Sequence, residues 1–350
     1  MLNCIGLKIM KYFLVIDQGT SSTRAILFDE NFRLVEVSQT EFKQFFPKDG
    51  WVEHDANEIF DTVIHCINDV MKKSGTTHNE IISIGITNQR ETCLLWDKDG
   101  TPYGKAIVWQ DRRTAEVCNN LKQQGLEGEI NQLTGLLADP YFSGTKLSWM
   151  LEKVGKRKDL FMGTIDTFLI WKLTEGKSYF MDATNASRTL LMDIRNISWS
   201  DDMCNLLNIP IEKLPEIKNS ADDFGETSLF GGKIKISGVA GDQQAALFGQ
   251  GCFEEGEAKS TYGTGCFMML NTGSKIKLSK SNLLTTVGYR IGGKVTYALE
   301  GSIFMAGASV QWLRDNLEFF NTSPEIESLA KKSNKNSNVF FIPAFTGLGA

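Results

Sequence analysis

Two short turns that contain glycine and threonine carry the residue types that bind phosphate. Asp17-Gln-Gly-Thr20 follows a predicted strand, and Tyr262-Gly-Thr-Gly265 lies between two more. Glycine lets the backbone approach a ligand closely, the hydroxyls can bond to phosphate oxygens, and the carboxylate can hold a hydrated Mg²⁺. One such turn alone is commonly an ordinary polar hairpin. Two of them, one in each half of the chain, favour a nucleotide held in a cleft between two domains.

A second set of polar residues follows predicted strands. Asp242 comes after the β-branched run 234–240 and before an apolar helix, so it would lie at the carboxyl end of a strand, where ligands bind in α/β sheets. A carboxylate there can accept a proton, although its spacing alone favours a helix cap. Arg90 and Glu91 follow another buried strand. Because adjacent side chains on a strand point to opposite faces, only a turn could aim both at one ligand, and a solvated pair is the usual alternative.

The remaining polar and aromatic clusters carry less information. Trp109 beside the charged residues 111–113, and the turn at Asp139-Pro-Tyr141, indicate no particular chemistry on their own. The three histidines, His54, His65 and His78, have neither metal-ligand spacing nor a nucleophile motif. Zinc catalysis and a Ser-His-Asp triad are therefore disfavoured.

The elements that must position these residues alternate between strands and helices. In the first half, strands are predicted over 12–16, 24–28, 32–39, 81–87 and 91–96, and helices over 57–71, 113–123, 146–154 and 167–173. Asp55 is the predicted cap of the first helix. From residue 233 the pattern restarts, with strands over 234–240, 258–262, 266–270, 295–299 and 339–345, helices over 243–250 and 306–316, and a surface loop over 331–338. The order predicts two α/β domains, the second partly echoing the first.

Composition bounds the class of protein. The chain has 350 residues, 42% of them hydrophobic, and a formal charge of −5 with no basic stripe, which disfavours nucleic-acid binding. No apolar run approaches the roughly 18 residues of a membrane span, and residues 1–11 do not form a convincing signal peptide. Seven scattered cysteines without a C-x-x-C pair are typical of reduced thiols. These features predict a cytoplasmic protein with a small-molecule partner, and they leave homo-oligomerisation open.

Six strings taken together resemble the FGGY family of carbohydrate kinases, and in particular its members that phosphorylate glycerol. They are Asp17-Gln-Gly-Thr20, Gly50-Trp-Val-Glu-His-Asp55, Gly85-Ile-Thr-Asn-Gln-Arg-Glu91, Asp139-Pro-Tyr-Phe-Ser-Gly-Thr145, Gly241-Asp-Gln-Gln-Ala-Ala-Leu-Phe-Gly249 and Tyr262-Gly-Thr-Gly-Cys-Phe267. The resemblance implies a duplicated actin-like, ribonuclease-H-like α/β fold with ligands in an interdomain cleft. It divides the chain into an extension (1–11), an N-terminal domain on the glycerol and phosphate side (12–250) and a C-terminal domain on the nucleotide side (251–350).

The resemblance also implies an activity, the transfer of phosphate from ATP to glycerol to give sn-glycerol 3-phosphate, and a role for each matching residue. Asp242 would be the general base. Glycerol would be bound by Arg90, Glu91, Trp109, Tyr141, Asp242, Gln243 and Phe267, with the two aromatic residues Trp109 and Phe267 as the apolar wall. ATP would lie along Thr20, Ser21, Ser22 and Arg24 on one side and Thr264, Gly307 and Gln311 on the other. Asp17 would lie near Mg²⁺.

Other interpretations remain open at this stage. The family's second domain continues past the sequence 345–350, so the resemblance predicts an incomplete second domain and impaired activity. A family member acting on another polyol or a pentulose is the nearest alternative, and Arg90, Glu91 and Trp109 favour the short triol over it. An actin-like ATP switch would need no base on the acceptor side. Release of ADP that depends on glycerol separates an enzyme from such a switch.

Overall fold

A six-stranded mixed sheet forms the centre of the protein. The computed structural model describes residues 10–155, 157, 159–263 and 265–342. The strands lie in the order β14-β15-β6-β1-β2-β3. Their bounds are β1 (Tyr12–Gln18), β2 (Ser22–Asp29), β3 (Leu34–Glu41), β6 (Ile81–Asn88), β14 (Glu226–Thr227) and β15 (Ile234–Gly241). β1 to β3 form an antiparallel meander, and β15, β6 and β1 run parallel. The carboxyl ends of these three parallel strands therefore meet at one edge, where the predicted site residues follow them.

Helix α1 (Ala56–Ser74) makes the crossover from the meander to the parallel strands and packs on β2 and β3. Its buried apolar residues recur every three or four positions, at Ile59, Val63, Ile67 and Val70, which is the spacing of one helix face. The predicted cap is confirmed, because the Asp55 side chain accepts hydrogen bonds from the first backbone N–H groups.

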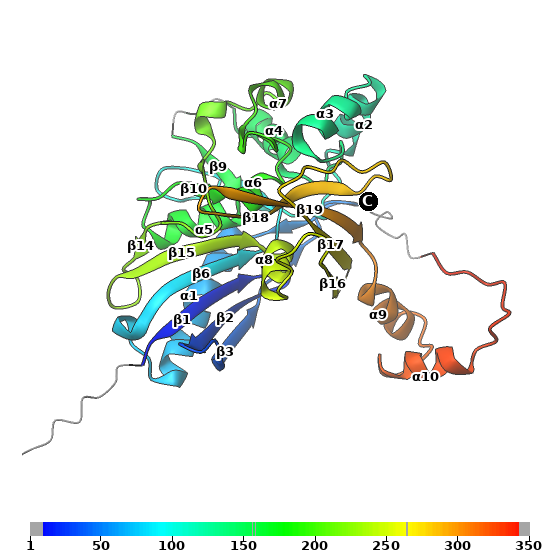
Figure 1. Ribbon diagram of the computed structural model, residues 1–350, viewed down its shortest axis with the longest axis horizontal. Helices are drawn as coiled ribbons and strands as arrows, with labels where there is room; N and C mark the ends of the chain where they lie inside the picture. Colours follow the sequence, from blue (N-terminus) through cyan, green and yellow to red (C-terminus); the bar gives the residue numbers. More distant parts are fainter. Residues whose placement is uncertain (1–9, 156, 158, 264, 343–350) are drawn as a thin grey trace, which may run out of the picture.

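A second group of short strands and helices packs beside the main sheet. Part of it shares the apolar core of that sheet, and part forms a second apolar core. Its five-stranded sheet consists of β4 (Gln44–Phe45), β5 (Glu53–His54), β8 (Ala106–Ile107), β7 (Cys93–Trp96) and β9 (Phe161–Thr164). Its helices are α2 (Ala115–Gln123), α3 (Glu127–Thr134), α4 (Ser143–Val154), α5 (Ile165–Leu173), α6 (Ala183–Ala186) and α7 (Asp201–Leu206). Two small ribbons pair β10 (Phe180–Asp182) with β13 (Glu216–Lys218) and β11 (Met192–Asp193) with β12 (Ser198–Trp199). In Figure 1, α2, α3, α4 and α7 gather on one side of the molecule.

The last third of the chain adds a four-stranded antiparallel sheet. Its order is β16 (Ala258–Tyr262), β17 (Cys266–Gly273), β19 (Lys294–Ile303) and β18 (Leu284–Ile291). Helix α8 (Asp242–Gly249) follows β15 and contacts both sheets. It therefore joins the ends of the parallel strands to the β16–β17 hairpin. Helices α9 (Gly307–Asp315) and α10 (Glu325–Lys332) stand apart from the sheets in Figure 1.

Most predicted elements are confirmed, and the mixed α/β class is correct. The expected strand over 339–345 is wrong where the structure describes it: residues 339–342 form no strand, and Val339 and Phe340 are more than four-fifths exposed. An apolar run forms a strand only when a neighbouring strand pairs with it, and 339–342 have none in the described structure. Residues 331 and 332 of the expected loop belong to α10. No helix among the described residues combines the length and the apolar character needed to cross a membrane.

Candidate active site

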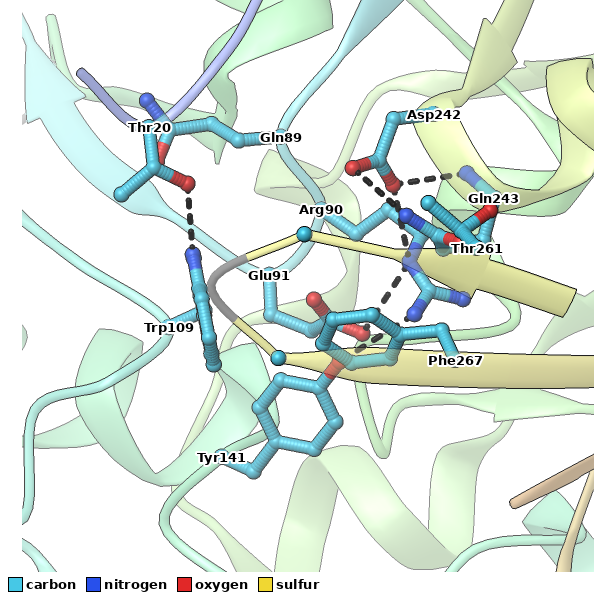
Figure 2. Close-up of a pocket in the computed structure, with 12 residues that line it drawn as sticks. Thr20, Gln89, Arg90, Glu91, Trp109, Tyr141, Asp242, Gln243, Thr261 and Phe267 are labelled. Carbon is cyan, nitrogen blue, oxygen red and sulfur yellow. Dashed lines mark hydrogen bonds and ion pairs between the residues drawn. The ribbon is translucent and has the colours of Figure 1, made fainter. Parts of the chain in front are cut away.

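A cavity of about 170 Å³ lies where the ends of the parallel strands meet the β16–β17 hairpin (Figure 2). This volume is below the roughly 300 Å³ at which sites for drug-sized ligands begin, so the cavity suits a small ligand. It is lined by Thr20, Gln89, Arg90, Glu91, Trp109, Tyr141, Asp242, Gln243, Thr261, Gly263, Gly265 and Phe267. All seven residues predicted to bind glycerol, the phosphoryl acceptor, are in this set, although their positions in the sequence range from 90 to 267.

Arg90 is the central side chain of the site and is only 3% exposed. Its Nη1 and Nη2 donate to the two carboxylate oxygens of Glu300 at 2.5 and 3.0 Å. Nη2 also lies 3.2 Å from the hydroxyl oxygen of Tyr141, and Nε lies 3.3 Å from Oδ1 of Asp242. Figure 2 shows the guanidinium between Asp242 and Tyr141. The alternative of a solvated surface charge is therefore wrong for Arg90, because β19 supplies a buried counter-ion.

Glu91 is the second member of a buried network of four charges. Its Oε1 accepts a hydrogen bond from Nε of Arg188 at 2.6 Å, and Nη2 of Arg188 donates to Glu300 at 3.0 Å. Two guanidinium groups therefore alternate with two carboxylates, which leaves the cluster neutral. Burial raises the pKa of Glu300, but the charges of Arg188 and Arg90 outweigh burial and hold that pKa at about 2.

A tight turn aims the adjacent pair at one cavity. β6 ends at Asn88, and Glu91 adopts a left-handed backbone with φ of 59°. Residues other than glycine, asparagine and aspartate rarely adopt this conformation. The turn brings Arg90 and Glu91 to the same side, and the backbone N–H of Thr92 donates to the carbonyl of Arg90 at 2.7 Å. This is the turn that the sequence required if both side chains were to meet one ligand.

Asp242 is the first residue of α8, and Gly241 before it occupies the N-cap position. The expected alternative role as a cap is therefore wrong. Oδ1 of Asp242 accepts the backbone N–H of Gln243 at 2.7 Å, and Oδ2 accepts Nε2 of Gln243 at 3.1 Å. Its side chain is 38% exposed and reaches the cavity. A carboxylate oxygen has two lone pairs, so Oδ2 can accept a second hydrogen bond, from a hydroxyl of a ligand.

Aromatic rings form the opposite wall of the cavity. Trp109 packs edge-on against Tyr141 and Phe267, with ring centroids 5.7 and 6.1 Å apart. Its indole Nε1 donates to Oγ1 of Thr20 at 2.9 Å. That bond fixes the plane of the indole ring and joins the turn 17–20, the first of the two predicted phosphate-binding turns, to the cavity. One wall is thus charged and the other apolar, which fits a ligand with hydroxyls on a short carbon chain.

The residues predicted for the phosphates lie along the first turn and β2. Thr20 lines the cavity, whereas Ser21, Ser22 and Arg24 do not. Ser21 is exposed, and Ser22 accepts a hydrogen bond from Gln39. Nη1 of Arg24 lies 3.3 Å from the carboxylate of Asp17.

The nucleotide-side residues of the last third are only partly placed. Thr264 lies outside the described residues. The backbone N–H of Gly307 donates to the carbonyl of Gly263 at 2.9 Å, which ties the start of α9 to the β16–β17 turn. Gln311 is exposed on α9 and does not line the cavity.

A metal site formed by protein alone is absent from the described residues, where no three His, Cys, Asp or Glu side chains cluster. Burial raises the pKa of Asp17, the charge of Arg24 lowers it, and the negative charge of Asp242 raises it further. Mg²⁺ is usually held by one or two carboxylates together with substrate phosphates. The carboxylates of Asp17 and Asp242, which repel each other beside the turn 17–20, therefore fit that ion.

Several residues that contact the predicted set escaped the sequence analysis: Gln89, Arg188, Gln244, Lys259, Thr261 and Glu300. A signal existed for Glu300, which is a single carboxylate directly after the apolar run 295–299. Glu300 lies within β19, and a charge buried inside a strand requires a partner. No comparable signal marks Arg188 or Lys259.

Gly241 offers a first test of the site. A Cβ atom added there would lie 2.7 Å from Cγ and 2.8 Å from Cδ of Arg90, and the ion pair with Glu300 prevents Arg90 from moving away. We expect Gly241→Ala to displace Arg90 and to lower kcat/KM for the acceptor about tenfold or more, with a stability cost of roughly 1–3 kcal/mol. Gly249→Ala is the matched control, because its added Cβ meets nothing within 4 Å. Equal kcat/KM for the two variants would contradict the expectation.

Comparison with known proteins identifies the family. Residues 12–249 match the N-terminal domain, and residues 258–350 the C-terminal domain, of the FGGY family of carbohydrate kinases. The chain is 57% identical to glycerol kinase from Rhizobium meliloti (strain 1021) and 52% identical to glycerol kinase from Staphylococcus haemolyticus (strain JCSC1435), over 97% of its own length and 70% of theirs. The crystal structure of Plasmodium falciparum glycerol kinase with ADP has a TM-score of 0.88 at 39% identity, again over 97% and 70% of the two chains. The protein therefore belongs to the FGGY family of carbohydrate kinases, with the actin-like ATPase fold of that family.

Proposed function

We propose that this protein transfers the γ-phosphoryl group of ATP to glycerol and forms sn-glycerol 3-phosphate. The observation that carries the proposal is the small cavity with one charged and one aromatic wall, in a chain more than 50% identical to glycerol kinases. We also propose that residues 12–250 and 251–350 are the two domains that hold the acceptor and the nucleotide.

The charged wall would select the acceptor. Glycerol offers three hydroxyls and little apolar surface, so its recognition depends on hydrogen bonds to charged partners, worth roughly 1.5–3 kcal/mol each. Arg90 and Glu91 present charged groups to the cavity, and Tyr141 and Gln243 add a hydroxyl and an amide. Trp109 and Phe267 would cover the carbon chain. Because the Arg90 guanidinium is already held by Glu300, it is oriented before the acceptor binds.

Asp242 would act as the general base. In the proposed step a glycerol hydroxyl oxygen attacks the γ-phosphorus, the bond from that phosphorus to the bridging oxygen of ADP breaks, and the hydroxyl proton passes to Asp242. Oδ1 is occupied by the Gln243 N–H and lies near Arg90 Nε, so Oδ2 is the oxygen that takes the proton. Phosphoryl transfer requires mainly such positioning and charge stabilisation.

The nucleotide would lie across the two turns. Thr20, Ser21, Ser22 and Arg24 would hold its phosphates, with Thr264, Gly307 and Gln311 on the other side. Asp17 would hold Mg²⁺, which would neutralise charge on the phosphates. The polar β1–β2 turn supports this arrangement, because it reaches the cavity through Thr20.

A coupled assay for ADP release tests the function. We expect ADP to form with glycerol and ATP, and at least a hundredfold more slowly with ATP alone or with a pentulose such as xylulose. Faster turnover of the pentulose would favour the alternative specificity. Release of ADP at the same rate with and without glycerol would indicate an ATP switch and contradict the proposal.

A further inference from the structure

Lys259 is a buried lysine behind the acceptor cavity and has no role in the proposed reaction so far. It lies on β16, and the residue is 6% exposed. Its Nζ donates to Oε1 of Gln243, to Oγ1 of Thr261 at 2.9 Å and to the carbonyl of Phe267 at 3.3 Å. An ammonium group has three donors, and all three have partners here. The lysine therefore joins α8 to both strands of the β16–β17 hairpin.

The contact with Gln243 determines which way that amide faces. Lysine donates hydrogen bonds and accepts none when charged, so it must meet the oxygen of the amide. The nitrogen Nε2 then faces the other way, where it donates to Oδ2 of Asp242 at 3.1 Å. A reversed amide would place its NH₂ group against the ammonium and its oxygen against the carboxylate. Both contacts would be repulsive, so Lys259 fixes the donor that orients Oδ2.

The charges around Lys259 keep it a donor at neutral pH. Burial lowers the pKa of Lys259 to about 8, and Arg90 lowers it as well, whereas Glu300, Asp242 and Cys266 raise it. At pH 7 most molecules therefore carry the ammonium form. A neutral side chain of similar length would fill the same space without the three donors.

We propose that Lys259 is a positioning residue for phosphoryl transfer, which acts by holding the Gln243 amide against Asp242 and the β16–β17 hairpin against α8. The inference rests on the proposed function, in which Asp242 takes the proton of the acceptor. Lys259 does not line the cavity. Its contact with α8 is made through Gln243, so its effect on the reaction passes through that amide.

A double-mutant cycle tests this coupling. We expect Lys259→Met to lower kcat about 10- to 100-fold, the loss associated with misplacement of a reacting group, with a smaller rise in KM for glycerol because Gln243 also lines the acceptor cavity. In the Gln243→Ala background the same substitution should cost less than threefold, because the amide that it orients is already absent. A full loss in that background, or kcat equal to that of the parent protein, would overturn the proposal. Lys277→Met is the control, since Lys277 is exposed and pairs only with Glu255 in the described contacts.

A second measurement does not depend on activity. The side-chain amide resonance of Gln243 can be assigned by its loss in Gln243→Ala and followed by ¹⁵N NMR. We expect Lys259→Met to shift this resonance and Lys277→Met to leave it in place. An unmoved resonance in Lys259→Met would overturn the proposal even if the protein phosphorylates glycerol. Failure to phosphorylate glycerol together with a shifted resonance would contradict the proposed function but support the positioning role.

Discussion

Replacing Asp242 with asparagine should lower kcat for glycerol phosphorylation by about 10²- to 10⁴-fold, the contribution of a positioned general base. Asparagine has the same shape and can still accept the Gln243 N–H, but it cannot take a proton from the acceptor. It also leaves the neighbouring Arg90 paired with Glu300, so the cavity should keep its form. Steady-state kinetics at saturating ATP and glycerol measure the effect.

Glycerol binding distinguishes loss of the base from loss of the site. Calorimetric titration should give a glycerol Kd for Asp242→Asn within about tenfold of the parent value. Asp99→Asn is a matched control on an exposed turn, where the carboxylate is 71% exposed and 3.8 Å from Lys98, and it should change neither kcat nor Kd. Turnover of Asp242→Asn within tenfold of the parent, a barrier change of only about 1.4 kcal/mol, would show that another group takes the proton.

Local patterns predicted the elements that end at the site. The β-branched runs at 12–16 and 234–240 and the apolar spacing of 57–71 each indicate one strand or helix, because burial on one face leaves a periodic trace in the sequence. The polar residues that follow those strands, such as Asp17 and Asp242, then share one sheet edge for topological reasons. The resemblance to the family added Trp109, Tyr141 and Phe267, whose neighbours in the sequence are uninformative.

Partners from distant segments could not be predicted in the same way. Arg188 and Glu300 lie 112 positions apart and meet only because the fold brings the segment after α6 beside β19. Local spacing in the sequence does not predict such a long-range contact, and a charged residue is ordinarily predicted to be exposed. The surface alternative for Arg90 and Glu91 failed for this reason. The described part of the expected strand, 339–342, shows the converse, since an apolar run does not form a strand where no neighbouring strand pairs with it.

Among the site residues, Glu300 is the one whose substitution should lower the stability of the protein most. We expect Glu300→Ala to lower the free energy of unfolding by about 3–5 kcal/mol, the cost of breaking a buried ion pair by removing one partner. Arg188 would then keep only Glu91 as a counter-ion, and Arg90 would keep Glu91 and the partly exposed Asp242, so neither guanidinium would retain the fully buried carboxylate that now joins them. Denaturation in urea at pH 7 measures the loss. Glu255→Ala is the control, because its pair with Lys277 is about half exposed and such pairs contribute roughly 0–1 kcal/mol.

The pH dependence of unfolding gives an independent test of the same charge. The folded-state pKa of Glu300, about 2, is below its ordinary value of 4.5, so its stabilisation is complete above pH 4.5 and is lost as the pH falls from 4.5 towards 2. In that range the unfolded chain binds up to one more proton at this position, a slope of about 1.4 kcal/mol per pH unit. Glu300→Gln cannot titrate and should therefore show a shallower loss of stability below pH 4.5 than the parent protein. Two results together would contradict this expectation: the same slope of unfolding free energy against pH for Glu300→Gln and the parent, and an unfolding free energy of Glu300→Gln at pH 7 equal to that of Glu255→Ala. They would mean that the two arginines do not depend on the charge of Glu300. The orientation of Arg90 before the acceptor binds would then need another cause.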